Sequence, residues 1–255
     1  MSTDPNRRRF VWRFFATASA AVLAGCDAVS RSSWAPKLFS AGEHANKGSQ
    51  RLLTSRASLA QEFTEADLSP DFRSNGTASP EDDAYQQHAA NNFADWKLRV
   101  DGLVRTPADL SLAQLRAMKS RTQITRHDCV EGWSAIGKWK GVQLSQVLAL
   151  AQPTPAARYA VFHCADPMDE SGTRYYESID LVDAHHPQTI LAYELNGKPL
   201  PVANGAPIRV RIERQLGYKM AKYIMRIELV DSFANIGGGN GGYWEDQGYE
   251  WYAGI

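Results

Sequence analysis

The sequence predicts an α+β fold with mixed β-sheets and short helices. Segments of strand character outnumber helical ones, and the two kinds do not alternate in the βαβ rhythm of a parallel α/β domain. Apolar residues make up 44% and charged residues 22% of the 255 residues, an ordinary globular composition. This length accommodates one domain or two small ones.

The first predicted elements are a hairpin and two helices. Residues 96–104 alternate between polar and apolar side chains and contain Asp101-Gly102, which predicts a hairpin that turns there. A residue typical of N-caps opens a short helix over residues 111–118. A second helix is predicted over residues 144–150.

Further segments are rich in β-branched and aromatic residues, in buried or half-buried patterns. They are the predicted strands 159–162, 190–195, 208–212 and 224–230, the second of which ends in a turn at Asn196-Gly197. The tail, residues 236–255, is glycine-rich and then aromatic, and we expect it to pack irregularly over the surface.

The region before the predicted domain has a different composition. Residues 27–84 are rich in Ser, Ala, Asn, Gly and charge, which indicates a tether and an irregular arm with weak helical character around residues 52–63. The ordered domain is expected over residues 85–255.

The N-terminus has the pattern of a targeting signal. Arg7-Arg8-Arg9-Phe10-Val11 resembles a twin-arginine export motif. A weakly apolar run of about 12 residues follows, long enough for a signal peptide but too short to span a membrane. A basic amphipathic surface helix is the alternative.

Cys26 closes a lipoprotein-like cleavage box, Leu23-Ala24-Gly25-Cys26. We therefore expect residues 1–26 to be a signal, with Cys26 carrying a lipid anchor on an exported, periplasmic protein. Ordinary cleavage nearby, which would leave a soluble periplasmic protein, is the alternative.

Cys129 stands in the segment RHDCVEGWS, residues 126–134, which we expect to be a loop. No second cysteine lies nearby, so a local C-x-x-C zinc or redox motif is excluded. A thiolate is a soft metal ligand and a nucleophile. Two alternatives remain: Cys129 is a small buried apolar residue, or it forms a disulfide with Cys164 in an oxidising compartment.

Two later segments have the residues of an anion site. NGAPIR, residues 204–209, ends in Arg209, and LGYKMAKY, residues 216–223, contains Lys222. Arginine clamps phosphate oxygens, and loop amides add donors. Solvated strand and loop charges are the alternative. Lys+Arg and Asp+Glu both number 28, so no broad basic field for nucleic acid is expected.

The order and spacing of these three segments resemble the molybdopterin-binding domain of the sulfite oxidase family, over residues 85–235. The nearest branch looks like the small bacterial enzymes without a haem or dimerisation domain, which include the periplasmic methionine sulfoxide reductase catalytic subunits. The resemblance implies molybdenum-molybdopterin without a nucleotide and two-electron oxygen-atom transfer. The oligomeric state is open, and the missing dimerisation domain favours a monomer.

The resemblance also implies roles for single residues. Cys129 would be the thiolate ligand of molybdenum, and Tyr175 the active-site tyrosine. The residues that match cofactor contacts are Asn91, Cys164, Asn204, Arg209, Met220, Ala221 and Lys222.

The chain departs from the family in two ways. The reductase branch has an arginine before the cysteine, where this chain has Asp128, and a carboxylate there should disfavour an anionic substrate. Sulfite oxidases surround the substrate with arginines, for which Arg126, Arg174 and Arg214 are the candidates. Both departures put sulfite in doubt as the substrate. The role of Cys164, which replaces a hydroxyl, is open.

Histidines and tail aromatics have less definite roles. His127 is a candidate to tune a metal thiolate, whereas His163 and His186 fit core or turn positions better than proton carriers. Seven Trp and ten Tyr exceed the needs of a generic core. Those of the tail either form a docking face for an electron partner or fold onto their own domain.

The sequence thus predicts a periplasmic molybdenum-pterin oxidoreductase that acts on a small oxo substrate, such as a sulfoxide or sulfite. It has no C-x-x-C-H haem motif, so electrons would pass to or from a membrane cytochrome b or a soluble cytochrome c. The alternative is a non-catalytic lipoprotein that uses the same fold as a binding module.

Overall fold

The computed structural model describes residue 32 and residues 34–255. The predicted signal, including Cys26, lies outside the described residues. The chain divides into two compact units, residues 1–53 and 54–255. In the described part of the first, helix α2 spans Ala35–Leu53. Over the described residues, we find no helix with the length and apolar character needed to cross a membrane.

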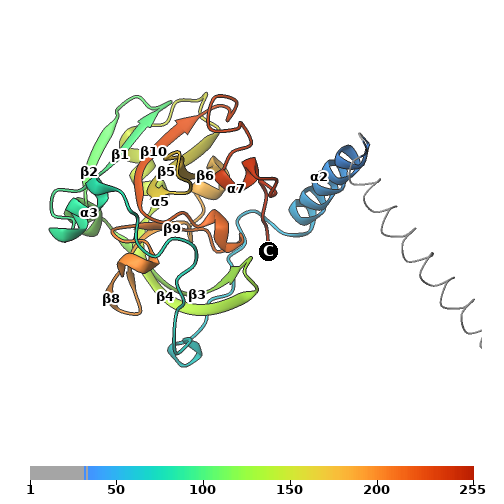
Figure 1. Ribbon diagram of the computed structural model, residues 1–255. Helices are drawn as coiled ribbons and strands as arrows, with labels where there is room; N and C mark the ends of the chain where they lie inside the picture. The colour runs from blue at the N-terminus through green and yellow to red at the C-terminus, as the bar shows by residue number, and fades with distance from the viewer. Residues whose placement is uncertain (1–31, 33) are drawn as a thin grey trace, which may run out of the picture. The chain divides into compact units, whose positions relative to one another are not determined.

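The second unit contains two five-stranded sheets, drawn one above the other in Figure 1. The first has the order β2-β1-β10-β5-β6, and the second β3-β4-β7-β8 with β9 on β7. The strands are β1 (Lys97–Gly102), β2 (Ala108–Ser111), β3 (Ser120–Cys129), β4 (Trp133–Gln143), β5 (Tyr159–Pro167), β6 (Arg174–Asp180), β7 (Ile190–Leu195), β8 (Lys198–Pro199), β9 (Arg209–Arg211) and β10 (Ile224–Val230).

The helices of this unit are short. They are α3 (Asp83–Ala90), α4 (Leu112–Ala117), α5 (Leu144–Ala151), α6 (Leu181–Ala184) and α7 (Tyr243–Asp246), with 3-10 turns η1 (Glu65–Asp67), η2 (Val202–Asn204) and η3 (Gly217–Lys219). Because β1 and β10 pair in parallel and their other neighbours are antiparallel, the first sheet is mixed. The predicted α+β class with short helices is confirmed, and the first sheet is mixed as predicted, whereas the strand pairs of the second sheet are all antiparallel.

The main core combines buried side chains of both sheets with the apolar face of α5. Leu98 and Phe162 come from the first sheet, Leu191 from the second, and Val147 from α5. A smaller core around Trp139 is closed by Phe72, whose ring meets the indole edge-on at 5.0 Å. Phe72 belongs to the irregular segment 54–84, which is therefore packed into the domain.

Several predicted elements are confirmed. The helix expected over residues 111–118 is α4, where Ser111 and Gln114 form a capping box that satisfies two backbone N–H groups. The helix at residues 144–150 is α5, and the four predicted strands correspond to β5, β7, β9 and β10. Asn196 and Gly197 both have positive φ in the tight turn between β7 and β8.

The chain does not turn at Asp101-Gly102, so the position predicted for the hairpin turn was wrong. Strand β1 continues through Gly102, and its antiparallel partner is Ala108–Ser111. Gly102 has φ +84°, and a side chain there would collide with the backbone of Leu229 on β10. A glycine is therefore required here because two strands approach closely, not because the chain forms a two-residue turn.

The loop predicted around Cys129 was wrong in extent. Cys129 is the last residue of β3 and pairs with Trp133, the first residue of β4. Strand β4 was missed because Gly137 and Gly141 interrupt its pattern of strand-forming residues. A side chain at Gly137 would meet the Phe72 ring at 2.9 Å, so this glycine is a packing requirement.

Three further expectations need correction. The arm predicted to be irregular over residues 27–84 contains helix α2, Ala35–Leu53, and the helical character predicted around residues 52–63 was misplaced, because this helix ends at Leu53. The second compact unit begins at Thr54, so the boundary expected at residue 85 does not coincide with it. The tail is mostly irregular, as predicted, but it forms the short helix α7.

Candidate functional site

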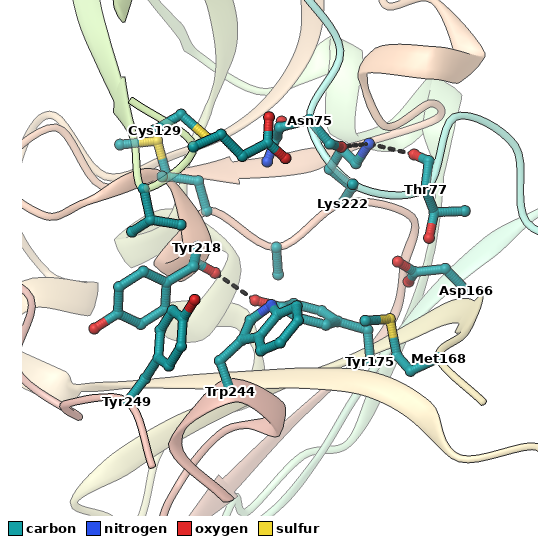
Figure 2. Close-up of a pocket in the computed structure, with 16 residues that line it drawn as sticks. Asn75, Thr77, Cys129, Asp166, Met168, Tyr175, Tyr218, Lys222, Trp244 and Tyr249 are labelled. Atoms are coloured by element: carbon teal, nitrogen blue, oxygen red, sulfur yellow. Dashed lines mark hydrogen bonds between the residues drawn. The ribbon is translucent and has the colours of Figure 1, made fainter. Parts of the chain in front are cut away.

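A cavity of about 230 Å³ opens beside Cys129. Its wall is built from the segment 75–77, the β3–β4 turn, the end of β5, β6, the η3 region and α7. Figure 2 shows Cys129 and Asp166 at opposite ends of this lining, with aromatic side chains along one side. The polar and apolar parts of the wall are thus separated.

Cys129 reaches the cavity because it ends a strand. A tight turn follows, in which the Gly132 N–H donates to the Cys129 carbonyl at 3.1 Å. Side chains alternate along a strand, so the neighbouring Asp128 points elsewhere. Asp128 accepts from the Ser134 hydroxyl at 2.5 Å and lines a different pocket. The expected effect of Asp128 on an anionic substrate was therefore wrong, and Glu131 is the carboxylate of this motif that lines the cavity.

The Cys129 thiol is free and partly buried. Burial raises its pKa, and the Glu131 carboxylate adds to this, whereas the Glu131 backbone and the Arg209 and Arg73 charges lower it. The raised pKa favours the protonated thiol in the metal-free protein. A metal that binds the sulfur would therefore displace this proton.

Arg209 is completely buried on β9. Its Nη atoms donate to the carbonyls of Asn204 and Met220, both at 3.2 Å, and its Nε has no partner. No carboxylate forms an ion pair with Arg209 in the part of the chain that the structure describes. Burial and the Arg211 charge lower its pKa to about 9, so it stays charged at neutral pH.

Lys222 is a second buried cation, and it lines the cavity. Its Nζ donates to the carbonyls of Asn75 at 2.6 Å, Ala203 at 3.1 Å and Thr77. Burial, with Arg209 nearby, lowers its pKa to about 7. For Arg209 and Lys222 the alternative of solvated charges is thus wrong.

Of the other residues predicted to contact the cofactor, some line the cavity and others do not. Met220 and Ala221 line the cavity, and the Met220 carbonyl ties this loop to Arg209. Asn204 is buried at the end of η2, where its Nδ2 donates to the Phe72 carbonyl at 3.5 Å. Asn91 lies exposed at the end of α3 and does not line the cavity.

Cys164 is buried in β5 and lies outside the lining. Burial raises the pKa of its thiol well above the ordinary value. Cys129 and Cys164 are both free thiols, so a disulfide between them is not formed.

Tyr175 and Asp166 bring two titratable groups to the cavity. The Tyr175 hydroxyl donates to the Tyr218 carbonyl, and burial holds its pKa well above the ordinary range. Tyr175 is therefore a neutral hydrogen-bonding group and not a base. Asp166 sits where the pairing of β5 with β6 is irregular, and its buried Oδ1 has no partner. Burial raises the Asp166 pKa to about 6.

His127 lies directly behind the cavity wall. Its Nδ1 accepts from Arg211 at 3.0 Å, which leaves Nε2 as the protonated nitrogen. That Nε2 has no partner and lies against Gly217, where a side chain would come within 2.5 Å of it. Burial and the nearby cations lower the His127 pKa well below its ordinary value, so the ring is neutral.

The remaining sequence candidates lie away from the cavity. His163 contacts Glu228 at 2.9 Å, and His186 contacts the Ser58 carbonyl at 3.1 Å. None of the three candidate arginines for binding an anionic substrate lines the cavity. These are Arg126, Arg174 and Arg214.

Sequence reasoning missed two parts of the wall. Asn75 and Thr77 belong to a segment expected to be an irregular arm, and no motif marks them. Trp244 and Tyr249 belong to the tail, where the density of aromatic residues was the available signal. The tail folds onto its own domain, as one of the two alternatives proposed.

Residues 85–235 match the sequence model of the oxidoreductase molybdopterin binding domain family, more than half of the chain. The chain belongs to this family. The predicted family, its fold and an oxidoreductase activity that depends on molybdopterin are thereby confirmed, and the alternative of a non-catalytic binding module loses its support.

Three named proteins resemble the chain in sequence. A protein of Azospira oryzae, provisionally named protein-methionine-sulfoxide reductase subunit YedZ1, is 37% identical over 98% of this chain and 88% of its own length. The protein-methionine-sulfoxide reductase catalytic subunits MsrP of Xanthomonas campestris and Xanthomonas axonopodis are 38% and 40% identical over 54% of this chain. The chain spans 46% of the length of these two MsrP proteins.

A solved structure also aligns with the chain. It is the sulfane dehydrogenase SoxCD of Paracoccus pantotrophus, with a TM-score of 0.48 and 21% sequence identity over 54% of this chain and 39% of that one.

The residues around the cavity fit a molybdopterin cofactor. Arg209 Nε, Asp166 Oδ1 and His127 Nε2 are buried polar atoms without partners, and such atoms cost free energy unless something satisfies them. The buried cations Arg209 and Lys222 also lack a carboxylate partner in the described residues. An anionic ligand rich in N–H and oxygen groups would satisfy both requirements.

Proposed function

We propose that the cavity binds molybdenum-molybdopterin without a nucleotide, with Cys129 as the protein ligand of the metal. The observation that carries this is a free thiol on a cavity that the buried Lys222 lines. The buried Arg209 lies behind this wall, bonded to the Met220 carbonyl, and neither cation has a carboxylate partner among the described residues. A molybdenum-pterin supplies two-electron redox chemistry on an oxygen atom. The protein supplies binding, orientation and charge.

Each residue has its own part in this work. Arg209 and Lys222 provide positive charge for the anionic groups of the cofactor. Asp166 offers an unpartnered oxygen to N–H donors of the pterin. Met220 and Ala221 form the wall through a loop whose carbonyls are fixed by Arg209 and by the backbone of β9.

We propose that the reaction is the reduction of a neutral sulfoxide. The sulfur–oxygen bond breaks, two electrons and two protons are consumed, and a thioether and water leave. Two observations support this over sulfite oxidation: among the described residues no arginine side chain lines the cavity itself, and aromatic side chains and Met168 form much of its wall. Relatives of the chain are named as methionine sulfoxide reductase subunits.

The electron donor we propose is a reduced membrane cytochrome b, with a soluble cytochrome c as the second candidate. The word subunit in the names of the relatives supports a partner protein. The twin-arginine-like motif and Cys26 support export to the periplasm and a lipid anchor.

The test is reduction of dimethyl sulfoxide and methionine sulfoxide by the purified protein, with reduced benzyl viologen as the electron donor. We expect Cys129→Ser to abolish turnover while the circular dichroism spectrum is unchanged. The matched control is Asp128→Ala, the adjacent residue of the same strand, which points away from the cavity and should retain most of the activity. Oxidation of sulfite with no reduction of any sulfoxide would refute the proposed direction.

A further inference from the structure

The tail contributes two rings to an aromatic wall of the cavity, although it lies beyond residues 85–235 that match the family. We define this wall as Tyr218, Trp244 and Tyr249. The rings of Trp244 and Tyr249 stack at 5.3 Å with an interplanar angle of 29°. Tyr218 meets Tyr249 edge-on, also at 5.3 Å. Figure 2 shows the three side chains gathered on one side of the cavity.

A buried ion cluster holds the aromatic wall in place. Lys219 Nζ contacts Glu245 Oε1 at 2.5 Å and also contacts Glu177, and all three side chains are at most 1% exposed. Lys219 is adjacent to Tyr218 in η3, Glu245 is adjacent to Trp244 in α7, and Glu177 lies in β6. One ammonium group thus joins three elements that line the cavity.

This buried ion cluster contributes little to the free energy of folding. Glu177 and Glu245 each keep one oxygen without a partner, and buried ion clusters rarely outperform apolar packing. What the cluster does provide is a fixed relative position for its three elements. Gly242 precedes α7, and a side chain there would collide with Glu245, so the helix begins where the carboxylate needs room.

The aromatic wall borders the mouth of the cavity. Tyr249 is 41% exposed and Val130, also in the lining, is 47% exposed. The wall carries no charge, and ring faces attract apolar groups and sulfur. A group attached to the sulfur of a substrate would therefore leave the cavity across these rings.

We propose that the aromatic wall determines substrate specificity by binding the apolar substituent on the substrate sulfur, and that Lys219 positions this wall. The inference rests on the proposed sulfoxide reduction. It predicts a preference for sulfoxides that carry an aryl or long alkyl group over dimethyl sulfoxide.

The test compares methyl phenyl sulfoxide with dimethyl sulfoxide, with reduced benzyl viologen as the donor. Because Trp244→Ala and Tyr249→Leu remove ring contacts, each should raise KM for methyl phenyl sulfoxide roughly tenfold with little change in kcat. KM for dimethyl sulfoxide should change less than about twofold. Tyr249 is partly exposed, so its variant will fold even if Trp244→Ala does not.

Phe233→Ala is the matched control. This aromatic side chain packs on Tyr159 and Trp251 and lies outside the cavity lining, so both KM values should stay unchanged. Equal changes for the two substrates in Tyr249→Leu, or none, would overturn the inference. Failure of the wild-type protein to reduce either sulfoxide would instead refute the proposed function.

The positioning role has its own pair of variants. Lys219→Met breaks both contacts and should raise KM for methyl phenyl sulfoxide as Trp244→Ala does. Glu245→Gln keeps an oxygen that accepts from Lys219, so its KM should stay close to the wild-type value. The inhibition constant of methyl phenyl sulfone, which resembles the substrate, should follow the same order. A loss confined to kcat in Lys219→Met would show that Lys219 does not position the wall.

Discussion

At the scale of single residues, burial distinguishes the charged side chains of the candidate cofactor site from ordinary surface charges. Arginine and lysine usually lie at the surface. Arg209 and Lys222 are nevertheless buried beside the cavity, without a carboxylate partner among the described residues. A buried charge without a partner is costly, so the metal-free protein is held in a state that an anionic ligand relieves. Binding of the cofactor should therefore stabilise the fold by mass action.

Asp166 gives a pH-dependent prediction for the metal-free protein. Burial raises its pKa from 3.8 to about 6, so the folded state holds this proton more tightly than the unfolded chain. Its contribution to stability is present in full below pH 3.8 and is lost as the pH rises through 6. The loss amounts to about 3 kcal/mol, with Lys222, Thr77, Tyr85 and Tyr223 as the groups facing the carboxyl.

Urea unfolding at pH 4 and pH 8 checks this. Asp166→Asn should remove the fall in the free energy of unfolding across this range, because an amide does not titrate. Lys222 acts in the opposite direction at the alkaline end. Its pKa is lowered to about 7, so the folded state loses this proton before the unfolded chain does, and stability rises towards pH 8 in the wild type and the variant alike. An unchanged pH dependence in Asp166→Asn would show that another group is responsible.

The residue types of the site could be predicted from the sequence better than their surroundings. Cys129, Tyr175, Met220, Ala221 and Lys222 all line the cavity as expected. Asp128 could not be judged, because its orientation depends on where β3 ends. Four further residues follow from a family resemblance, and the structure places them outside the lining: Asn91, Cys164, Asn204 and Arg209.

At the scale of elements, glycines set how closely the parts of the site approach. The element η3 begins at Gly217, which lies against the His127 ring of β3. The sequence marks this glycine only as a permissive residue, because the element it contacts is far away in the chain. Gly137 and Gly141 also contact parts of the chain that are distant in sequence, and their presence is the reason why strand β4 was not predicted.

Gly217→Ala should therefore displace η3. The new methyl group would lie 2.5 Å from His127 Nε2, so we expect a loss of about 1–3 kcal/mol in the free energy of unfolding and a large loss of activity. The control is Gly48→Ala, where no atom lies within 4 Å, and which should not destabilise the protein. Equal free energies of unfolding for the two variants would contradict the close approach of η3 and β3.

At the scale of the whole molecule, the irregular segment 54–84 is part of the catalytic unit. Phe72 closes the core around Trp139, and the Asn75 and Thr77 carbonyls bind Lys222 at the cavity. Composition indicated an irregular arm over residues 27–84, which holds for most of 54–84 but not for α2 (Ala35–Leu53). It could not reveal that the segment is packed, because one buried phenylalanine leaves no periodic pattern.

Phe72→Ala tests this in the full chain. Removing a buried ring should lower the free energy of unfolding by about 3–5 kcal/mol, measured by denaturant titration. Leu59 lies in the same segment but is 56% exposed, so Leu59→Ala should cost less than about 0.5 kcal/mol. Similar small losses in both variants would mean that the segment does not pack on the domain.

The most direct test of the account is the molybdenum content of the full chain, expressed with its own N-terminus in cells that make the cofactor. We predict about one molybdenum atom per chain, together with molybdopterin released on denaturation. A reference molybdoenzyme from the same cells controls for cofactor supply. A chain that is folded and free of molybdenum, beside a fully loaded reference enzyme, would contradict the assignment of Cys129 and of the cavity.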